Sequence, residues 1–250
     1  MKRQYVVPAS NNAMRVSFLN SVLLLLAAFL CLAATASSAA TMPAPLRAAA
    51  SESTSALSTA GAKLTFRRIF KSSTPEFIEI SVREDSDQST YEIRQLDDDS
   101  EKSPFEVSAP LRAKMFELAA QLNRFQNQDL DVHRKIANLG EKTFRWEKGS
   151  EVHEAVFNYT LNTAASQLLQ IFEGLARQQE LVMLLERRMK YDRLGINDAL
   201  LQFESDLNRK LLPEPQRALP ALDQIANDAR FVDIARQRAR SVAERIRHAS

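Results

Sequence analysis

Apolar and polar residues alternate between residues 142 and 160, and this pattern predicts a β-hairpin that leads directly into a long amphipathic helix. The turn falls at Gly149 and Ser150. One face of the hairpin carries Phe144, Trp146, Ala155, Phe157 and Tyr159, and the other carries Thr143, Arg145, Glu147, Val152, Glu154 and Val156. A sheet with one apolar face needs a cover, and the helix over 162–190 offers one. Its apolar stripe consists of Leu168, Phe172, Leu175, Val182, Leu185 and Met189.

An earlier hairpin is predicted over 77–96, with its turn at 85–88. That turn sets four opposed pairs, which are Val82 with Tyr91, Ile80 with Ile93, Glu79 with Arg94, and Ser81 with Glu92. In the second hairpin the same reasoning places Arg145 opposite Glu154. Exposed pairs of this kind contribute about 0.2–1 kcal/mol each, so they fix the register more than they stabilise the sheet.

The segment LTFRRIF (64–70) predicts a fifth strand at an edge of the sheet. Ser108 is expected to cap a helix with Pro110 in its first turn, and Gly140 is expected to turn the chain into the second hairpin. The apolar stripe of the capped helix is Leu111, Met115, Leu118, Leu122 and Phe125. Residues 63–194 therefore predict an α+β domain, in which amphipathic helices cover an antiparallel sheet of two hairpins and this edge strand.

The remaining residues, 195–250, predict a C-terminal helical region packed on that domain, either as a separate unit or wrapped around the sheet. The long helix is expected to end near Leu194, with Gly195 left-handed and Ile196 folding back on it. Asn197 would cap the next helix, whose apolar face is Leu200, Phe203, Leu207 and Leu211. Pro213 and Pro215 break the chain before a stretch over 215–226 that Pro220 bends or restarts. A last helix capped by Asp228 would bury Phe231, Ile234, Ala235, Val242 and Ile246.

The N-terminus has the pattern of a secretory signal peptide over 1–36. Three basic residues precede an apolar run from Phe18 to Ala34, and small residues suited to cleavage follow. The apolar run is also long enough to span a membrane, so an uncleaved anchor is the alternative. Residues 37–62 are rich in Ala, Ser and Thr and predict a flexible linker. We expect a secreted or periplasmic location after cleavage.

Composition removes several classes of function. Five glycines leave no place for the glycine-rich phosphate loops of nucleotide-binding proteins. After cleavage at residue 36 the chain has 30 basic and 31 acidic residues, a net charge of −1, so we expect no nucleic-acid partner. Cleavage also removes Cys31, the single cysteine, which leaves neither a disulfide nor a thiol nucleophile. No Gly-x-Ser-x-Gly motif of a serine hydrolase occurs.

A metal site can be drawn from the alternating Asp129, Asp131 and His133 together with His153 of the second hairpin. No metal-ligand spacing such as HExxH or CxxC supports it, and the predicted register places His153 opposite Trp146, where the two rings would pack together. From sequence we therefore assign no catalytic, cofactor-binding or metal residue.

Two charged segments offer further candidates. The acidic turn with Asp97, Asp98, Asp99 and Glu101 lacks the glycine and spacing of an EF-hand loop, which favours a solvated turn. The last helix could present an arginine-rich face to an anionic partner or to lipid. This face comprises Arg230, Arg236, Arg238, Arg240, Arg245 and Arg247. Acidic residues lie among these arginines, so a solvated helix face is the preferred interpretation.

The order of elements resembles that of uncharacterised exported bacterial domains with two hairpin–helix units. The resemblance covers about residues 64–190, and its most characteristic segments are YEIRQL and EKTFRWEKGSEVHEAVFNY. It implies the fold, and it implies no activity because such domains have no known one.

The hypothesis that combines these observations is an exported, non-catalytic binding protein, with a protein or a cell-envelope component as its partner. The free strand edge near 64–70 and the C-terminal helices are the expected contact surfaces. One alternative is an envelope structural protein tethered to the membrane by an uncleaved N-terminal helix. The other is a metal-dependent protein or enzyme that uses Asp131, His133 and His153. The sequence does not define the oligomeric state.

Overall fold

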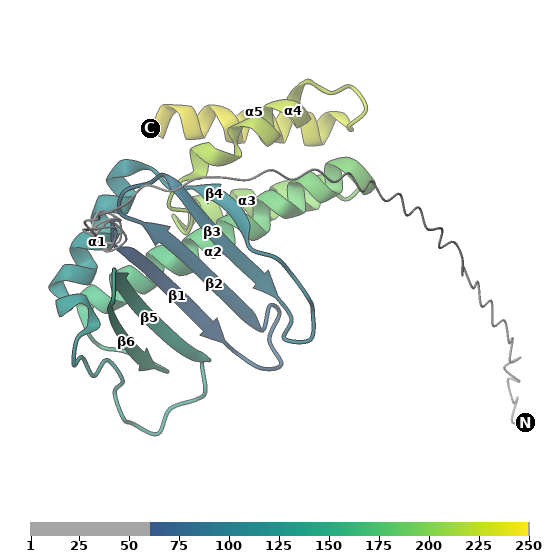
Figure 1. The fold of residues 1–250 in the computed structure, drawn as a ribbon. Coiled ribbons are helices and arrows are strands. Elements are labelled where there is room, and N and C mark those ends of the chain that lie inside the picture. Colours follow the sequence, from purple (N-terminus) through teal and green to yellow (C-terminus); the bar gives the residue numbers. More distant parts are fainter. Residues whose placement is uncertain (1–60, 250) are drawn as a thin grey trace, which may run out of the picture. The chain divides into compact units, whose positions relative to one another are not determined.

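A computed structural model describes residues 61–249, which fold into one six-stranded antiparallel sheet with helices on one of its faces (Figure 1). The strands are β1 (Lys63–Ile69), β2 (Phe77–Arg83), β3 (Gln88–Arg94), β4 (Ser103–Glu106), β5 (Glu141–Lys148) and β6 (Glu151–Phe157). The helices are α1 (Ala109–Gln121), α2 (Thr163–Tyr191), α3 (Ile196–Asn208), α4 (Leu219–Asn227) and α5 (Asp233–Ala249), with short 3₁₀ turns at Asn123–Phe125 and Pro215–Ala218. The predicted α+β class is confirmed.

Strand β1 lies in the middle of the sheet, so the prediction of an edge strand over 64–70 was wrong. The strand order is β4-β3-β2-β1-β5-β6, and β1 pairs with β2 on one side and with β5 on the other. The edges are β6 and the short strand β4, which the sequence analysis missed. Strand β1 thus joins the two predicted hairpins into one sheet and has no free edge of its own.

The register of the first hairpin differs from the prediction by two residues. Ile80 pairs with Tyr91 instead of Ile93, and Glu79 pairs with Glu92 instead of Arg94. The turn lies earlier, and its residue Asp85 accepts a hydrogen bond at 2.9 Å from the N–H of Gly61, which lies just before β1. A shift of two leaves every side chain on its predicted face, since side chains alternate with period two.

The second hairpin has the predicted register, with Arg145 opposite Glu154 and Trp146 opposite His153. Its apolar face is buried as expected, except that Tyr159 is 43% exposed. This residue lies beyond the end of β6, so the alternation of the strand no longer determines its direction.

The inner face of the sheet packs on α1 and on the first half of α2. Ser108 caps α1 as predicted, by accepting a hydrogen bond from Leu111 N. The centre of this cluster is aromatic: Phe66 of β1 stacks on Phe172 of α2 with ring centroids 5.2 Å apart, and Phe144 of β5 stacks on Phe125 at 5.3 Å. All four rings are fully buried, so they hold sheet and helices together by close packing.

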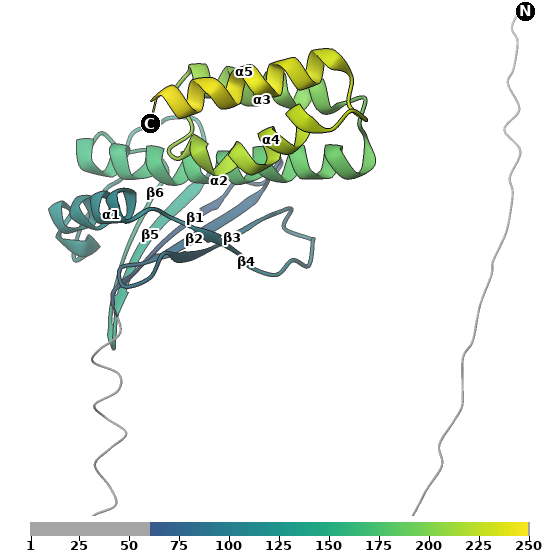
Figure 2. The same cartoon turned by 90° about the horizontal axis from the view of Figure 1, so that it is seen from above.

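Helix α2 is buried on a second side by the C-terminal helices (Figure 2). Leu168, Phe172 and Leu175 contact the sheet cluster, whereas Leu181 and Leu185 belong to a second apolar cluster formed with α3, α4 and α5. Val182 and Met189, which were predicted to cover the sheet, pack on this second cluster instead.

The turn between α2 and α3 is built differently from the prediction. Helix α2 ends at Tyr191, and Gly195 has a right-handed φ of −79° as the residue that begins α3. The side chain of Asp192 accepts a hydrogen bond from Gly195 N at 3.0 Å, so an aspartate makes this turn where a left-handed glycine had been expected. Neither Asn197 nor a folded-back Ile196 has the predicted role, because both lie inside α3.

The last two helices also begin differently. Pro220 restarts the chain as α4, in agreement with the prediction, but Asp228 ends α4 and does not cap α5. Helix α5 begins at Asp233, so Ile234 lies in its first turn and is 57% exposed, whereas a buried position had been predicted. Phe231, Ala235, Val242 and Ile246 are buried as expected.

The loop at 211–214, called the α2 joint below, binds the C-terminal helices to the rest of the fold. Glu214 is 2% exposed; its carboxylate accepts a hydrogen bond from Ser108 N, and its own N–H donates to Gln178 of α2. Beside this joint, Gly174 of α2 lies directly against the chain at Leu211. The helical region therefore packs on α2 and on the start of α1.

Only the end of the predicted 37–62 linker falls within the described residues. Gly61 and Ala62 are already part of the fold: Ala62 is 2% exposed, and its carbonyl accepts a hydrogen bond from Glu84 N. The predicted signal peptide, 1–36, lies outside the described residues. Between residues 61 and 249, no helix has the length and apolar character needed to cross a membrane.

We expect the substitution Gly174→Ala to lower the free energy of unfolding by about 1–3 kcal/mol, although alanine is the better helix former. An added Cβ would lie 2.7 Å from the carbonyl oxygen of Leu211 and 2.9 Å from Pro213, so the α2 joint must open. Urea unfolding measures the change. The exposed Gln170→Ala, one turn earlier, should stay within about 0.5 kcal/mol of the wild type. Equal stability of Gly174→Ala and the wild type would contradict the tight joint.

Candidate functional site

Of the predicted metal residues, His133 lies between Asp129 and Asp131, with its Nδ1 3.7 Å from Asp131 Oδ2, whereas His153 is remote from all three. Asp129 and His133 are bonded to each other at 2.6 Å, and this hydrogen bond raises the pKa of the His133 imidazole. Asp131 Oδ1 instead accepts the backbone N–H groups of Asn158 and Tyr159, at 2.8 and 3.2 Å. Asp131 thus holds its loop against the end of β6, which explains its position without a metal ion.

His153 lies near the other end of β6, about 15 Å along the strand from Asn158. Its ring stacks on Trp146 with centroids 5.7 Å apart, as the register predicted. Across residues 61–249, no group of three or more His, Cys, Asp and Glu side chains is arranged to hold a metal ion.

The arginines at the C-terminus are engaged within the helical region. The contacts are Arg230 with Asp228, Arg236 with Asp233, Arg238 and Arg245 with Glu204, Arg240 with the carbonyl of Ala226, and Arg247 with Asp223. Each guanidinium thus has at least one acceptor, although Nε of Arg236 and Nε of Arg238 are buried without a hydrogen-bond partner in the described part of the chain. The acidic turn at 97–101 is exposed, as predicted.

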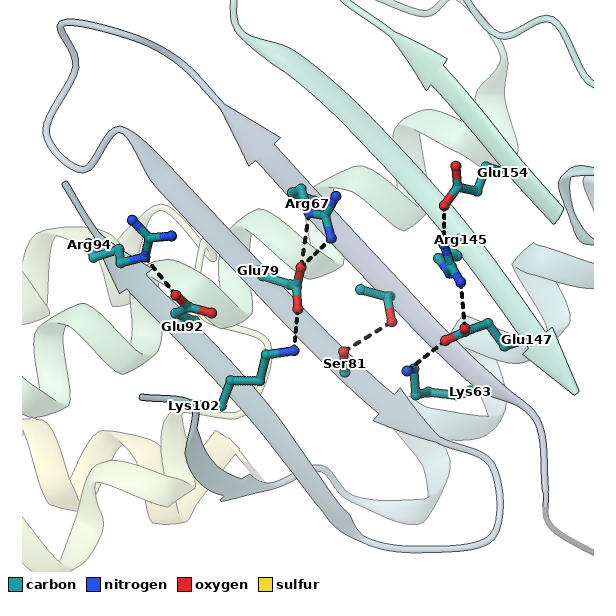
Figure 3. A network of polar contacts seen from close by, with 11 residues as sticks. Lys63, Arg67, Glu79, Ser81, Glu92, Arg94, Lys102, Arg145, Glu147 and Glu154 are labelled. Atoms are coloured by element: carbon teal, nitrogen blue, oxygen red, sulfur yellow. Dashed lines mark hydrogen bonds and ion pairs between the residues drawn. The ribbon is translucent and has the colours of Figure 1, made fainter. Parts of the chain in front are cut away.

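The outer face of the sheet, which no helix covers, carries a network of ion pairs (Figure 3). At its centre, Glu79 of β2 binds Arg67 of β1 at 2.8 Å and Lys102 at 2.6 Å. Burial alone would raise the pKa of Glu79, but these two hydrogen-bonded cations hold it below its usual value. Toward β6, Glu147 binds Lys63 at 2.6 Å and Arg145 at 2.8 Å.

Charges on this face are therefore compensated in cross-strand pairs. Arg145 also binds Glu154 of β6 at 2.6 Å, so the chain of contacts runs across three strands (Figure 3). Pairs of this exposure contribute little stability, and their main effect is to fix strand register.

The candidate site is a cleft between the inner face of the sheet and the flank of α2, called the α2 cleft below. Its volume is about 680 Å³, within the range of small-molecule sites, which is about 300–1,000 Å³. The sheet side is formed by Thr74, Pro75 and Ile93. The helix side includes Glu180, Met183, Leu184, Arg187, Lys190 and Tyr191.

A row of paired residues leads from this cleft under α2. Ile93 of β3 pairs with Ile78 of β2, which pairs with Arg68 of β1, which in turn pairs with Lys142 of β5. Paired residues share a face, so the two cations lie side by side on the inner face. Arg68 interacts electrostatically with Glu180, which lines the α2 cleft, but Arg68 itself is not one of the lining residues.

The two cations of the row differ in their bonding. Lys142 is 5% exposed and donates hydrogen bonds to the carbonyls of Leu139, Gly140 and Asn158, at 3.0, 3.2 and 2.9 Å. Its burial lowers the pKa of the Lys142 ammonium. Arg68 is partly buried, and its Nε is buried without a hydrogen-bond partner in the described part of the chain. Arg68 therefore retains free donor capacity.

Two carboxylates of α2 face these cations. Burial raises the pKa of Glu173, and nearby Lys142 and Arg68 only partly offset that effect. Burial likewise raises the pKa of Glu180, which accepts a hydrogen bond from Arg177 at 3.3 Å. Arg177 is bound more closely by Asp206 of α3, at 2.7 Å. Raised carboxyl pKa values next to a lysine with a lowered one are typical of functional sites.

The chain matches no protein-family model, and no curated protein is similar to it. The resemblance to exported hairpin–helix domains thus stays a prediction, and the function must be argued from the geometry of the site.

Sequence reasoning missed the α2 cleft and the inward-facing cations near it, although a signal for one of these cations was present. Arg67 and Arg68 are consecutive in a strand, so they point to opposite faces, and one of them must enter the apolar side of the sheet. Arg67 is 47% exposed at its side chain and paired with Glu79, which identifies Arg68 as the inward one.

The substitution Glu173→Gln is expected to raise the free energy of unfolding at pH 7 and to have no effect at pH 4. The carboxyl of Glu173 has a higher pKa in the folded protein than its ordinary value of 4.5. Its contribution to stability is therefore fully present below pH 4.5 and is lost as the pH rises through the pKa of the folded protein. Glutamine stays neutral throughout. Denaturant unfolding from pH 4 to 8 measures the difference; the exposed Glu186→Gln should show a smaller one. A pH-independent effect of Glu173→Gln would contradict the burial of this carboxyl.

Proposed function

We propose that this is an exported, non-catalytic binding protein whose ligand occupies the α2 cleft. The observation that carries the proposal is the α2 cleft itself, whose volume of about 680 Å³ is that of a small-molecule site and whose helix side combines apolar residues with the cations Arg187 and Lys190. A ligand in this cleft would cover apolar side chains that otherwise remain exposed.

The walls of the cleft fit binding better than they fit catalysis. Met183 and Tyr191 are 44% and 72% exposed, which is high for large side chains that a ligand or a partner does not cover. The carboxyls of Glu173 and Glu180 lie beneath α2 among cations that hold them in place. We infer no reaction from this arrangement.

We prefer the α2 cleft to the two contact surfaces expected from sequence. Strand β1 has neighbours on both sides, so a partner cannot add to an edge at 64–70. The arginines near the C-terminus pair with acidic residues of the helical region, which partly neutralises their charge.

Export is the other half of the proposal, and it rests on the residue pattern of 1–36. N-terminal sequencing of the protein from its native host is expected to begin at Ser37 or Thr41. A start upstream of the apolar run would contradict cleavage and would support the tethered structural protein instead.

Binding in the cleft is tested by capture from a native envelope extract on the immobilised protein. The substitution Met183→Glu adds a charge to the exposed wall of the cleft, and we expect it to reduce the captured component at least about tenfold. Leu201→Glu is the matched control, since Leu201 is 45% exposed on α3 and is not part of the cleft. Equal capture by all three proteins, or no capture by the wild type, would contradict the proposed function.

A further inference from the structure

We propose that the cleft between α1, the first half of α2 and residues 209–213 binds a ligand with a phosphate monoester group, which Lys114, Arg209 and Lys210 hold. This cleft, called the α1 cleft below, has a volume of about 780 Å³, within the range of small-molecule sites. The inference goes beyond the proposed function, because it assigns a second site. It follows from the charges of the lining, from their free bonding capacity and from the backbone at Lys210.

The lining of the α1 cleft is strongly cationic. Within the described part of the chain, four basic residues line it against one acidic residue, Glu173. The basic residues are Lys114 of α1, Arg177 of α2, and Arg209 and Lys210, which follow α3. Burial raises the pKa of the Glu173 carboxyl, so this group keeps its negative charge less readily than an exposed glutamate does. Cations gathered around one cavity repel each other, and an anion in the cavity would offset this repulsion.

The two arginines of the lining differ in their bonding. Arg177 donates to Asp206 at 2.7 Å, so its guanidinium is already held by a carboxylate. Arg209 lies 3.9 Å from the same carboxylate, which is too long for a hydrogen bond, and its side chain is 68% exposed. Arg209 is therefore the arginine with donors to offer a ligand.

The two lysines of the lining also retain donor capacity. Lys114 binds Glu117 at 3.1 Å, but both side chains are about half exposed, so solvent weakens this pair. The ammonium of Lys210 has no partner among residues 61–249. The cleft thus brings together three cations whose charge the protein itself compensates weakly or leaves uncompensated.

The backbone at Lys210 is a second observation, independent of the charges. Lys210 has a φ of 56°, in the left-handed region that residues other than glycine rarely adopt. It follows the C-cap of α3, where two backbone hydrogen bonds of a Schellman motif close the helix. These bonds run from Lys210 N to the carbonyl of Leu207 and from Leu211 N to the carbonyl of Asp206, both at 3.0 Å. Glycine is the usual residue at this position, because it has no Cβ.

The dipole of α3 does not account for a lysine at this position. A cation near the C-terminus of a helix is favourable, and Arg209 supplies one with an ordinary right-handed φ of −80°. A second cation in a left-handed position adds backbone strain that a glycine would avoid. Strain of this kind is concentrated at ligand-binding positions, and Lys210 lines the cleft.

A phosphate monoester fits three separate donor groups better than a carboxylate does. It carries close to two negative charges at neutral pH and three acceptor oxygens, whereas a carboxylate has one charge and two oxygens. Lysine ammonium groups are common phosphate ligands, and the planar guanidinium of Arg209 can bind two phosphate oxygens at once. The rest of the ligand would lie against the apolar part of the lining, which includes Pro213 and the 40% exposed Leu211. Small phosphorylated molecules and lipid head groups both carry such a phosphate.

The first test is calorimetric titration of the full-length protein with glycerol 3-phosphate at about pH 7.5, together with co-sedimentation with phosphatidylcholine vesicles that contain phosphatidate. We expect Lys210→Gly to weaken binding at least about tenfold, because a charge-assisted hydrogen bond is lost. The same variant should melt about 2–4 °C higher than the wild type, because glycine relieves the left-handed backbone. A loss of binding in a more stable protein cannot result from unfolding.

Further variants and ligands serve as controls. Arg209→Gln should also weaken binding at least about tenfold. Lys148→Gln removes an exposed lysine beside the turn between β5 and β6, outside the cleft, and should leave binding unchanged. Glycerate and glycerol, which share the carbon skeleton of glycerol 3-phosphate, should each bind at least about tenfold more weakly, since the first carries a carboxylate and the second no charge.

Several results would overturn the inference. These are the absence of binding to both glycerol 3-phosphate and phosphatidate, equal binding by the wild type and Lys210→Gly, equal affinity for glycerate, and a lower melting temperature of Lys210→Gly. Binding of glycerol 3-phosphate identifies a small phosphorylated molecule as the ligand. Binding of phosphatidate vesicles alone, lost in Lys210→Gly, identifies a lipid head group. The α2 cleft is tested separately by Met183→Glu, so either proposal can fail without the other.

Discussion

The structure depends on burying α2 from two sides at once. Its first half packs against the aromatic cluster of the sheet through Phe172, and its second half packs against α3, α4 and α5 through Leu181 and Leu185. A helix with one apolar stripe can serve only one layer, so the stripe of α2 changes direction near its middle. The residues at the change are Gly174, which permits close approach of the chain at Leu211, and Gln178, which binds the N–H of Glu214.

This double role explains where the charged residues lie. One side of α2 belongs to neither apolar cluster, and this side carries Glu173, Arg177 and Glu180. This side faces the end of the inner sheet surface where Arg68 and Lys142 replace the apolar residues found elsewhere on that surface. The α2 cleft is therefore a consequence of packing one helix in two layers. Its polar groups lie between the two apolar clusters.

Features that depend on residues close together in the sequence were predicted correctly, whereas features that depend on residues far apart were not. The second hairpin, the cap at Ser108 and the faces of the strands came out correctly, because local alternation and turn residues determine them. The central place of β1 could not be predicted, since pairing between β1 and β5 joins residues about 80 positions apart and leaves no local mark. The first hairpin was also misplaced, and its turn binds Gly61, which lies outside the hairpin.

The cations near the α2 cleft were missed because the sequence analysis searched for motifs, while Arg68 is a single exception to an alternating pattern. Strand β1 reads KLTFRRI, and its inward positions are Leu64, Phe66 and then Arg68. An apolar residue at 68 would continue the core without any desolvated charge. An arginine in that position keeps a charge beneath α2 and, with Lys142 beside it, makes that end of the inner face cationic. The opposite orientation of Arg67, which is paired with Glu79 on the outer face, provides the internal comparison that identifies this exception.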